Sequence, residues 1–159
     1  MTIRTGDRIP DATLTIMGEK GPQPITTAEV FSGKKVVLFS VPGAFTPTCS
    51  ARHLPGFVER AEEILARDVD TVACMAVNDV FVMDAWGKSA GADRILMLAD
   101  GNGEFTRSLG LELDATGFGM GERSQRFALI AEDGVVTGLF VEAPGEFKVS
   151  SAEHVLSNL

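Results

Sequence analysis

One cysteine in this sequence lies where a thiol can act as a nucleophile. The apolar run Val36–Val41 ends at Pro42, a loop rich in Gly and Pro follows, and Cys49 falls in the first turn of the expected helix. A free cysteine thiol has a pKa near ~8.5, and unpaired N–H groups at a helix N-terminus favour the thiolate. Thr46, three residues before Cys49, can bring a hydroxyl to the same place, and Pro47 stiffens the loop. The pattern predicts a reactive thiolate at Cys49.

The alternative interpretation is a structural cysteine, because free cysteines are often fully buried. The loop before Cys49 and its position at a helix start argue against a structural role for Cys49. Cys74 lies in the middle of the apolar run Thr71–Val77, and a structural role is expected for it. His53 follows Cys49 by four residues on the same helix face. It can form a Cys–His dyad, or it can simply line a pocket or the surface. His154 is expected on the surface of the last helix.

The charge balance limits the classes of partner. The chain has 159 residues, with 14 basic and 22 acidic side chains and a net charge of −8. Such a charge disfavours non-specific binding to nucleic acid or to an anionic membrane. It also opposes a thiolate, so a nearby cation is needed to help Cys49. We expect no nucleic-acid partner and no membrane partner.

Length and cysteine count suggest the setting of the protein. A chain of 159 residues is typical of a single domain, here 1–159. No apolar run approaches the ~18–20 residues of a membrane span. The segment Met1–Asp7 lacks the apolar core of a secretory signal, so we expect a reducing, cytoplasmic compartment with free thiols. Two cysteines and two histidines argue against a structural zinc site.

Two apolar runs and the pattern between them predict the elements that position the cysteine. The runs Val36–Val41 and Thr71–Val77 are typical of parallel strands covered on both faces. Apolar residues over Leu54–Leu65 recur at helical spacing, and we expect this helix to begin near Thr48. Pro55 lies inside the helix and cannot donate to the preceding turn, which predicts a kink. Together these elements form a β-α-β unit with a right-handed crossover.

The remaining pattern completes an α/β plan. Asp133-Gly134 marks the turn of a hairpin. The order of elements predicts a thioredoxin-like fold, with a central mixed sheet flanked by helices and an N-terminal strand extension. The other expected elements are a strand over Ala12–Met17, a helix over Val80–Lys88, a strand over Ile95–Ala99, a helix over Glu104–Leu109, hairpin strands over Arg126–Ile130 and Val135–Phe140, and a last helix from Ser150 or Ser151 to near Leu159.

The segment around Cys49 resembles the motif of a known enzyme family. The pattern Pro42-x-x-x-Thr46-x-x-Cys49 is similar to the peroxidatic motif of the peroxiredoxins. Three longer strings resemble the type II, peroxiredoxin-five-like branch, which includes glutaredoxin-dependent members. They are PGAFTPTCSARHLPGFVE, TVACMAVNDVFVMDAWG and SQRFALIAEDGVV. The similarity follows the same order over most of the chain.

The resemblance implies a role for each matching residue. Cys49 would be the thiolate that attacks a peroxide and becomes a sulfenic acid, and Thr46 would bond the thiolate and the attacked oxygen. Pro42 would shield the sulfenic acid from water, and Arg126 would be the cation that the net charge demands. His53 would line the site without acting as a base. The implied activity is reduction of hydrogen peroxide and alkyl hydroperoxides, with no metal, haem or flavin.

The resemblance also raises the question of how Cys49 is reduced again. Some members of the branch carry a resolving cysteine after a V-E-x-x-G segment. Here Val141–Gly145 is followed by Glu146–Ser151, which contains no cysteine, and Ser150 or Ser151 occupies that region. Cys74 should be buried in the sheet, so it could form a disulfide only after local unfolding. We expect a one-Cys mechanism with an external thiol: glutathione, glutaredoxin or thioredoxin.

Four aromatic residues are expected near the active-site end of the fold. They are Phe45, Phe81, Trp86 and Phe118. They either pack in the core or form an apolar patch buried in a homodimer, and the resemblance favours a dimer through this edge.

Two glycine-containing segments resemble ligand-binding loops, and two other functions are alternatives to a peroxidase. The segment Gly117–Gly121 lacks the strand-to-helix context of a nucleotide loop, and Asp100–Glu104 lacks the last ligand of a calcium loop. We expect a flexible loop and a turn. A thiol–disulfide oxidoreductase would need a second cysteine within Cys49–Arg52. A redox sensor without turnover would be oxidised only once per molecule.

Overall fold

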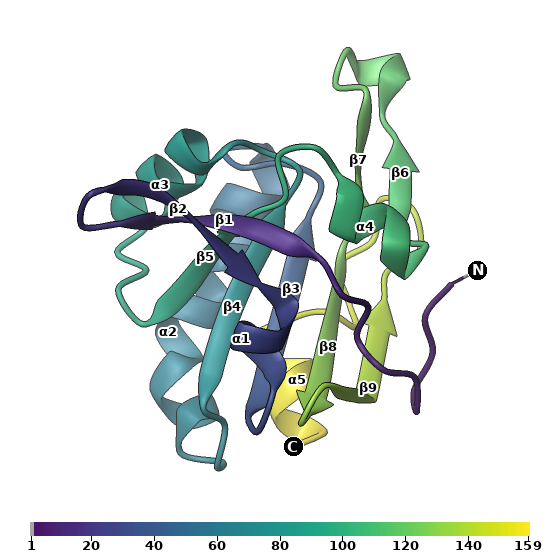
Figure 1. The fold of residues 1–159 in the computed structure, drawn as a ribbon. Helices are drawn as coiled ribbons and strands as arrows, with labels where there is room; N and C mark the ends of the chain where they lie inside the picture. The colour runs from purple at the N-terminus through teal and green to yellow at the C-terminus, as the bar shows by residue number, and fades with distance from the viewer. Residues whose placement is uncertain (1) are drawn as a thin grey trace.

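The computed structural model describes residues 2–159, and its centre is a mixed sheet of seven strands (Figure 1). The strand order is β2-β1-β5-β4-β3-β8-β9. Strands β3, β4 and β5 are parallel to one another, whereas β8, β9, β1 and β2 are joined by antiparallel pairs. The bounds are β1 (Thr13–Gly18), β2 (Gly21–Thr26), β3 (Lys35–Val41), β4 (Thr71–Ala76), β5 (Ile95–Ala99), β8 (Phe127–Glu132) and β9 (Val135–Val141). This is the predicted thioredoxin-like arrangement.

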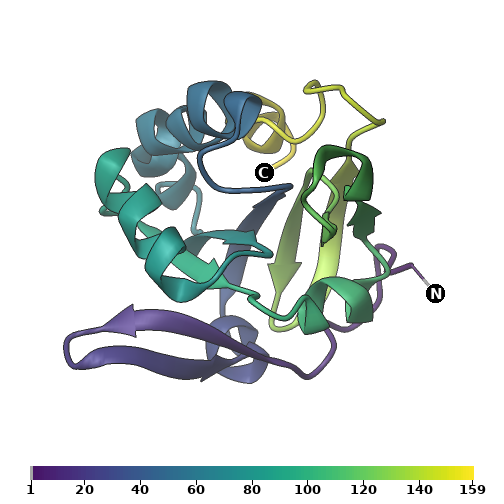
Figure 2. The same cartoon turned by 90° about the horizontal axis from the view of Figure 1, so that it is seen from above.

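Helices cover both faces of the sheet (Figure 2). Helices α2, α3 and α5 pack on one face, where Phe57, Trp86 and Val155 join one apolar cluster. Helices α1 and α4 lie on the other face, where Phe31 and Phe105 join a second cluster. The bounds are α1 (Thr27–Phe31), α2 (Leu54–Leu65), α3 (Val80–Ser89), α4 (Glu104–Leu109) and α5 (Ala152–Ser157).

Strand β3 is buried over all but its first residue, as its continuous apolar sequence predicts. It lies between β4 and β8, and its side chains alternate between the two clusters. Phe39 points toward α2 and stacks on Phe57 with ring centroids 4.0 Å apart, while Leu38 points to the opposite face. Because neighbouring strands fix β3 on both sides, the loop that follows it begins from a rigid point.

The C-terminal elements match their predictions closely. Asp133 and Gly134 both adopt positive φ, 49° and 76°, as the tight turn between β8 and β9 requires. Of the two serines considered as caps, Ser151 is the N-cap of α5, and its hydroxyl accepts the His154 N–H. The strand expected from Arg126 begins one residue later, so Arg126 lies at the entrance of β8.

Several short elements were not predicted. Strand β2 and helix α1 follow β1, and a separate two-stranded sheet pairs β6 (Glu112–Asp114) with β7 (Glu122–Ser124). The segment expected as a flexible loop at Gly117–Gly121 belongs to the tip of this small hairpin, where a 3-10 turn spans Thr116–Phe118. The hairpin projects beyond the end of the central sheet (Figure 1).

The Asp100–Glu104 segment is the expected turn, and it is also a helix cap. Asp100 is buried, and its carboxylate accepts the backbone N–H groups of Phe105 and Thr106 and the Thr106 hydroxyl. These bonds fix the start of α4, so the acidic side chain has a structural use.

Candidate active site

The loop between β3 and α2 is shaped by a strained residue and a side-chain bond. Phe45 has φ of 62°, which is uncommon for a residue with a side chain. Asn78, just after β4, accepts the Ala44 N–H at 2.9 Å and fixes this bend. Helical hydrogen bonding then begins when Ser50 N–H donates to the Thr46 carbonyl at 2.9 Å. Within residues 2–159, the Cys49 N–H has no backbone acceptor, so it is free to face a ligand.

The helix containing Cys49 includes a π turn shortly before Pro55, the residue at which a kink was predicted. The π turn spans Cys49–His53, and the Leu54 N–H donates to the Cys49 carbonyl. Pro55 has no N–H to give the Ala51 carbonyl, so a wider turn before Pro55 accommodates it. Both Cys49 and His53 are fully buried there.

Arg126 joins these two side chains. One arm of its guanidinium, Nη2, donates to Cys49 Sγ at 3.0 Å, and the other arm, Nη1, lies 2.8 Å from His53 Nδ1. The cation that the net charge demanded is therefore in contact with the sulfur. A guanidinium at this distance favours a negative charge on Cys49.

His53 does not contact the sulfur, so the Cys–His dyad is absent from this geometry. Its Nε2 lies 2.9 Å from the Ser150 carbonyl, and its Nδ1 faces Arg126. Burial lowers the pKa of His53 to about 3, and the nearby charge of Arg126 acts in the same direction. The ring is thus neutral near pH 7, and it is enclosed by Phe39, Phe57 and Phe147. The surface alternative for His53 is wrong.

Thr46 and Pro42 lie beside Cys49 but differ in how they relate to the sulfur. The Thr46 hydroxyl donates to the Gly43 carbonyl at 2.7 Å, rather than to Cys49 as the resemblance implied. A carbonyl is a stronger acceptor than sulfur, and the hydroxyl oxygen keeps its lone pairs for a ligand O–H. Pro42 follows β3 directly and lines a cavity of about 520 Å³ together with Thr48 and Arg126.

The cavity next to Arg126 has mostly apolar walls, with a few charged side chains among its lining residues. Its other lining residues are Leu113, Phe118, Gln125, Glu142, Ala143, Pro144, Gly145 and Glu146. Leu113 and Phe118 come from the β6–β7 hairpin, Gln125 lies between β7 and β8, and the others follow β9. A molecule larger than hydrogen peroxide therefore has room next to Arg126.

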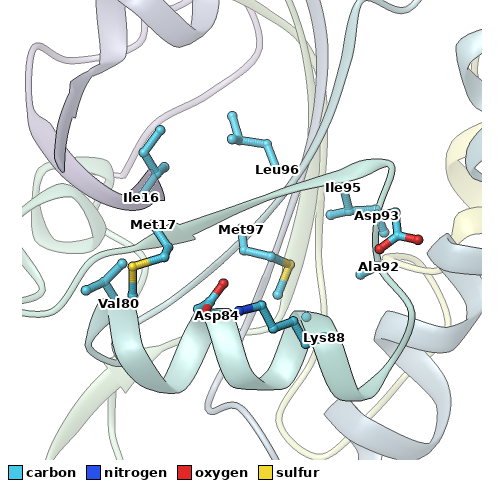
Figure 3. Close-up of a pocket in the computed structure, with 11 residues that line it drawn as sticks. Ile16, Met17, Val80, Asp84, Lys88, Ala92, Asp93, Ile95, Leu96 and Met97 are labelled. Carbon is cyan, nitrogen blue, oxygen red and sulfur yellow. Dashed lines mark ion pairs between the residues drawn. The ribbon is translucent and has the colours of Figure 1, made fainter. Parts of the chain in front are cut away.

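A second hollow lies elsewhere on the molecule. Figure 3 shows this groove of about 260 Å³, lined by side chains of β1, α3 and β5, among them Met17 and Met97. Its Lys88 and Asp84 form an ion pair at 3.0 Å. None of the residues around Cys49 lines it.

Cys74 occupies the structural position predicted for it. It is fully buried in β4, paired in register with Phe39. Burial raises the pKa of the Cys74 thiol well above its ordinary value, and the proximity of Cys49 adds to this. Both cysteines are free thiols.

The aromatic patch predicted for a dimer is only partly present on the surface. Phe45, Phe81 and Phe118 are 54%, 64% and 85% exposed, but Trp86 is only 1% exposed. The inclusion of Trp86 was wrong, because its ring fills the core beneath α3 and its Nε1–H donates to the Ser50 hydroxyl at 2.9 Å. Trp86 therefore fastens α3 to the π turn that carries Cys49.

Two further groups at the site were missed. Glu142 is buried, and its carboxylate accepts the N–H groups of Lys148, Val149 and Ser150 and the Ser150 hydroxyl. Burial raises the pKa of Glu142, but these hydrogen bonds outweigh it, so the net pKa lies below the usual value. Arg123 was also missed. Its Nη1 donates to the Val77 carbonyl at 3.2 Å and its Nε donates to Met120, which ties the β6–β7 hairpin to the end of β4.

Two other kinds of feature are absent from the described part of the chain. Residues 2–159 contain no cluster of three or more His, Cys, Asp or Glu side chains able to hold a metal ion. Over the same residues, no helix has the length and apolar character needed to cross a bilayer.

Comparison with known proteins places this geometry in a family. Residues 4–156 match the Redoxin family model. The chain is 52% identical over 99% of its length to peroxiredoxin-2E-2 of Oryza sativa subsp. japonica, a chloroplastic protein of which it covers 73%. Reduced Prx3 from Vibrio vulnificus, solved in complex with H2O2, superposes with a TM-score of 0.96 at 53% identity over 99% of both chains. The Plasmodium falciparum antioxidant protein, a 1-Cys peroxiredoxin, has a TM-score of 0.91 at 32% identity over 99% of this chain and all of that one. The chain therefore belongs to the redoxin family and, within it, to the peroxiredoxins, which are thiol-dependent peroxidases.

Proposed function

We propose that Cys49 is the peroxide-attacking thiolate of this peroxidase. The observation that carries the proposal is the 3.0 Å contact from Arg126 Nη2 to Cys49 Sγ at a fully buried sulfur. The thiolate attacks the O–H oxygen of a hydroperoxide, an S–O bond forms and the O–O bond breaks. Cys49 becomes a sulfenic acid, and the leaving oxygen takes a proton to give water or an alcohol.

Three groups of the chain support this displacement. Negative charge moves from sulfur to the leaving oxygen, so donors aimed along that path stabilise the transition state more than the ground state. The Arg126 guanidinium and the unused Cys49 N–H are such donors. Thr46, whose own proton is held by the Gly43 carbonyl, accepts the hydroperoxide O–H and orients it. Pro42 keeps water from the product sulfenic acid.

The reductant is an external thiol. Cys74 is enclosed in β4, and Ser150 occupies the segment where a resolving cysteine would lie. The sulfenic acid condenses with one thiol to form a mixed disulfide and water, and a second thiol releases Cys49. Glutathione with glutaredoxin, or thioredoxin, fits this scheme. The similarity to a 1-Cys peroxiredoxin supports it.

The substrates include alkyl hydroperoxides as well as hydrogen peroxide. The apolar walls of the 520 Å³ cavity beside Arg126 give the organic part of a hydroperoxide a place to lie. A homodimer through exposed Phe45, Phe81 and Phe118 is also proposed, because large apolar side chains this exposed often mark a contact surface. A cytoplasmic location stays a prediction, since a chloroplastic protein is among the relatives.

Turnover is the experiment that tests the function. The protein is supplied with peroxide, glutathione and glutaredoxin, and peroxide loss is followed beyond one equivalent of protein. Many cycles, lost in Cys49→Ser, support the peroxidase. A single stoichiometric oxidation would instead identify a redox sensor.

A further inference from the structure

The guanidinium of Arg126 has two acceptors, and only one of them is the reacting sulfur. Nη2 reaches Cys49 Sγ at 3.0 Å, while Nη1 reaches His53 Nδ1 at 2.8 Å. The two arms belong to one rigid plane, so the position of the His53 ring fixes the direction in which the other arm points. The contacts that fix the His53 ring therefore also set the orientation of the Arg126 guanidinium toward the sulfur.

The two partners of His53 require the same tautomer. Arg126 can only donate, so Nδ1 must be unprotonated and accept. The Ser150 carbonyl can only accept, so Nε2 must carry the proton and donate to it at 2.9 Å. A neutral ring protonated at Nε2 satisfies both contacts; a charged ring would lose the contact with Arg126, and a ring protonated only at Nδ1 would lose both.

The Ser150 carbonyl is in turn held by Glu142. Glu142 lies directly opposite Arg126, since its N–H donates to the Arg126 carbonyl at 3.0 Å. Opposite charges placed this way on adjacent strands ordinarily pair. Here they form no ion pair in the part of the chain that the structure describes. Instead the Glu142 carboxylate accepts four donors from Lys148–Ser150, at 2.7–2.9 Å.

We propose that His53 and Glu142 are positioning residues for Arg126. Glu142 fixes the segment Lys148–Ser150, the Ser150 carbonyl fixes the His53 tautomer, and His53 Nδ1 aims the guanidinium at Cys49. Because its oxygens are occupied by that segment, Glu142 also leaves the guanidinium free for the sulfur. The inference rests on the proposed roles of Cys49 and Arg126, and neither His53 nor Glu142 exchanges a proton with substrate.

The first test uses the unaltered protein. Imidazole nitrogen NMR of the reduced protein should show His53 neutral and protonated at Nε2 at every pH from weakly acid to neutral. A ring protonated at Nδ1, or a positively charged ring near neutral pH, would overturn the proposal. The measurement needs no variant and no turnover, so its result does not depend on the peroxidase assay.

The second test separates hydrogen bonding from packing at His53. His53→Phe keeps a ring among Phe39, Phe57 and Phe147 but loses both polar atoms. His53→Gln keeps an acceptor and a donor about as far apart as those of imidazole. We expect His53→Phe to slow sulfenic acid formation about tenfold to a hundredfold and to move the thiolate titration to higher pH, as for loss of a charged hydrogen bond. His53→Gln should restore much of both. His154→Phe, at the other histidine, is the matched control.

The third test addresses Glu142. Glu142→Ala should slow the same step and shift the same titration, while Glu153→Ala, at an exposed acid of α5, should change neither. Wild-type values in Glu142→Ala, or equal losses in His53→Phe and His53→Gln, would contradict the positioning role. Those results would leave the peroxidase assignment intact, whereas wild-type protein without Cys49-dependent turnover would overturn the function itself.

Discussion

Replacing Arg126 tests the electrostatic basis of the site most directly. In Arg126→Ala, Cys49 Sγ loses a donor at 3.0 Å. A hydrogen bond to a charged group contributes about 1.5–3 kcal/mol, and one pH unit corresponds to about 1.4 kcal/mol. The thiolate should therefore be harder to form in the variant, and attack on peroxide should slow by about tenfold to a hundredfold. Part of that loss comes from a smaller fraction of thiolate, and part from weaker stabilisation of the leaving oxygen.

A pH profile then separates the two contributions of Arg126. At a pH high enough to ionise any free thiol, a deficit that remains in the variant reflects weaker stabilisation of the leaving oxygen. For one lost donor of this type we expect a residual loss of up to about a hundredfold. Arg126→Lys keeps the charge, but its single amine cannot bond Cys49 and His53 together. Its rate of attack on peroxide should therefore lie between that of the parent and that of Arg126→Ala. Rapid-mixing kinetics with one equivalent of peroxide measure the step.

A surface arginine provides the control for Arg126→Ala. Arg94→Ala removes a surface cation paired with Glu62 and should behave like the parent, which excludes an effect of net charge. An unchanged titration together with an unchanged rate in Arg126→Ala would refute the reasoning. Full recovery of the rate at alkaline pH would limit Arg126 to ionising Cys49.

Four further outcomes are expected. Cys49→Ser should abolish peroxide turnover while Cys74→Ser largely keeps it, and equal loss in both would contradict an external reductant. Thr46→Val should slow the peroxide step about tenfold or more, with Thr46→Ser near the parent, because only the hydroxyl bonds substrate; equal rates in the Val and Ser variants would remove that role. Phe81→Ala should weaken self-association in analytical ultracentrifugation, and a profile like that of the parent would remove Phe81 from the interface. His53 has a native pKa of about 3 against 6.5 ordinarily, so unfolded chains bind more protons between these values. The free energy of unfolding should then fall by up to about 1.4 kcal/mol per pH unit as pH drops through that window; His53→Phe should show a shallower slope, and the same slope in both proteins would contradict this origin.

The elements that could be predicted from the sequence are those whose signal is local. Strand β3 has an uninterrupted apolar sequence, and the β8–β9 turn contains an Asp-Gly pair with the required positive φ. Strand β2 gave no such signal, because it contains Pro22 and Pro24, which an edge strand tolerates. Helix α1 is only five residues long, although the capping box of Thr26 and Glu29 was a usable indication.

The residues of the site likewise differ in whether the local sequence gives a signal for them. Cys49 and Thr46 follow from the order of strand, loop and helix, and Arg126 was identified only through the family resemblance. Glu142 and Ser150 could not be found, since a glutamate is ordinarily exposed and a serine carbonyl carries no sequence signal. Their use emerges only when the chain brings Ser150 within 2.9 Å of His53. The burial of Trp86 was likewise hidden, because an aromatic side chain on a short helix fits a core and a surface patch equally well.

The anchoring of Lys148–Ser150 bears on why an external thiol suits this protein. In the branch it resembles, that region can carry a resolving cysteine, and such a cysteine must travel to the sulfenic acid. Here the same segment holds Glu142 with four donors and His53 with a carbonyl, so displacing it would also release Arg126. A segment that positions the attacking sulfur through Arg126 is poorly suited to leave its place in every cycle. With no cysteine there, the segment can stay fixed through the peroxide step, which agrees with the proposed reduction of Cys49 by an external thiol.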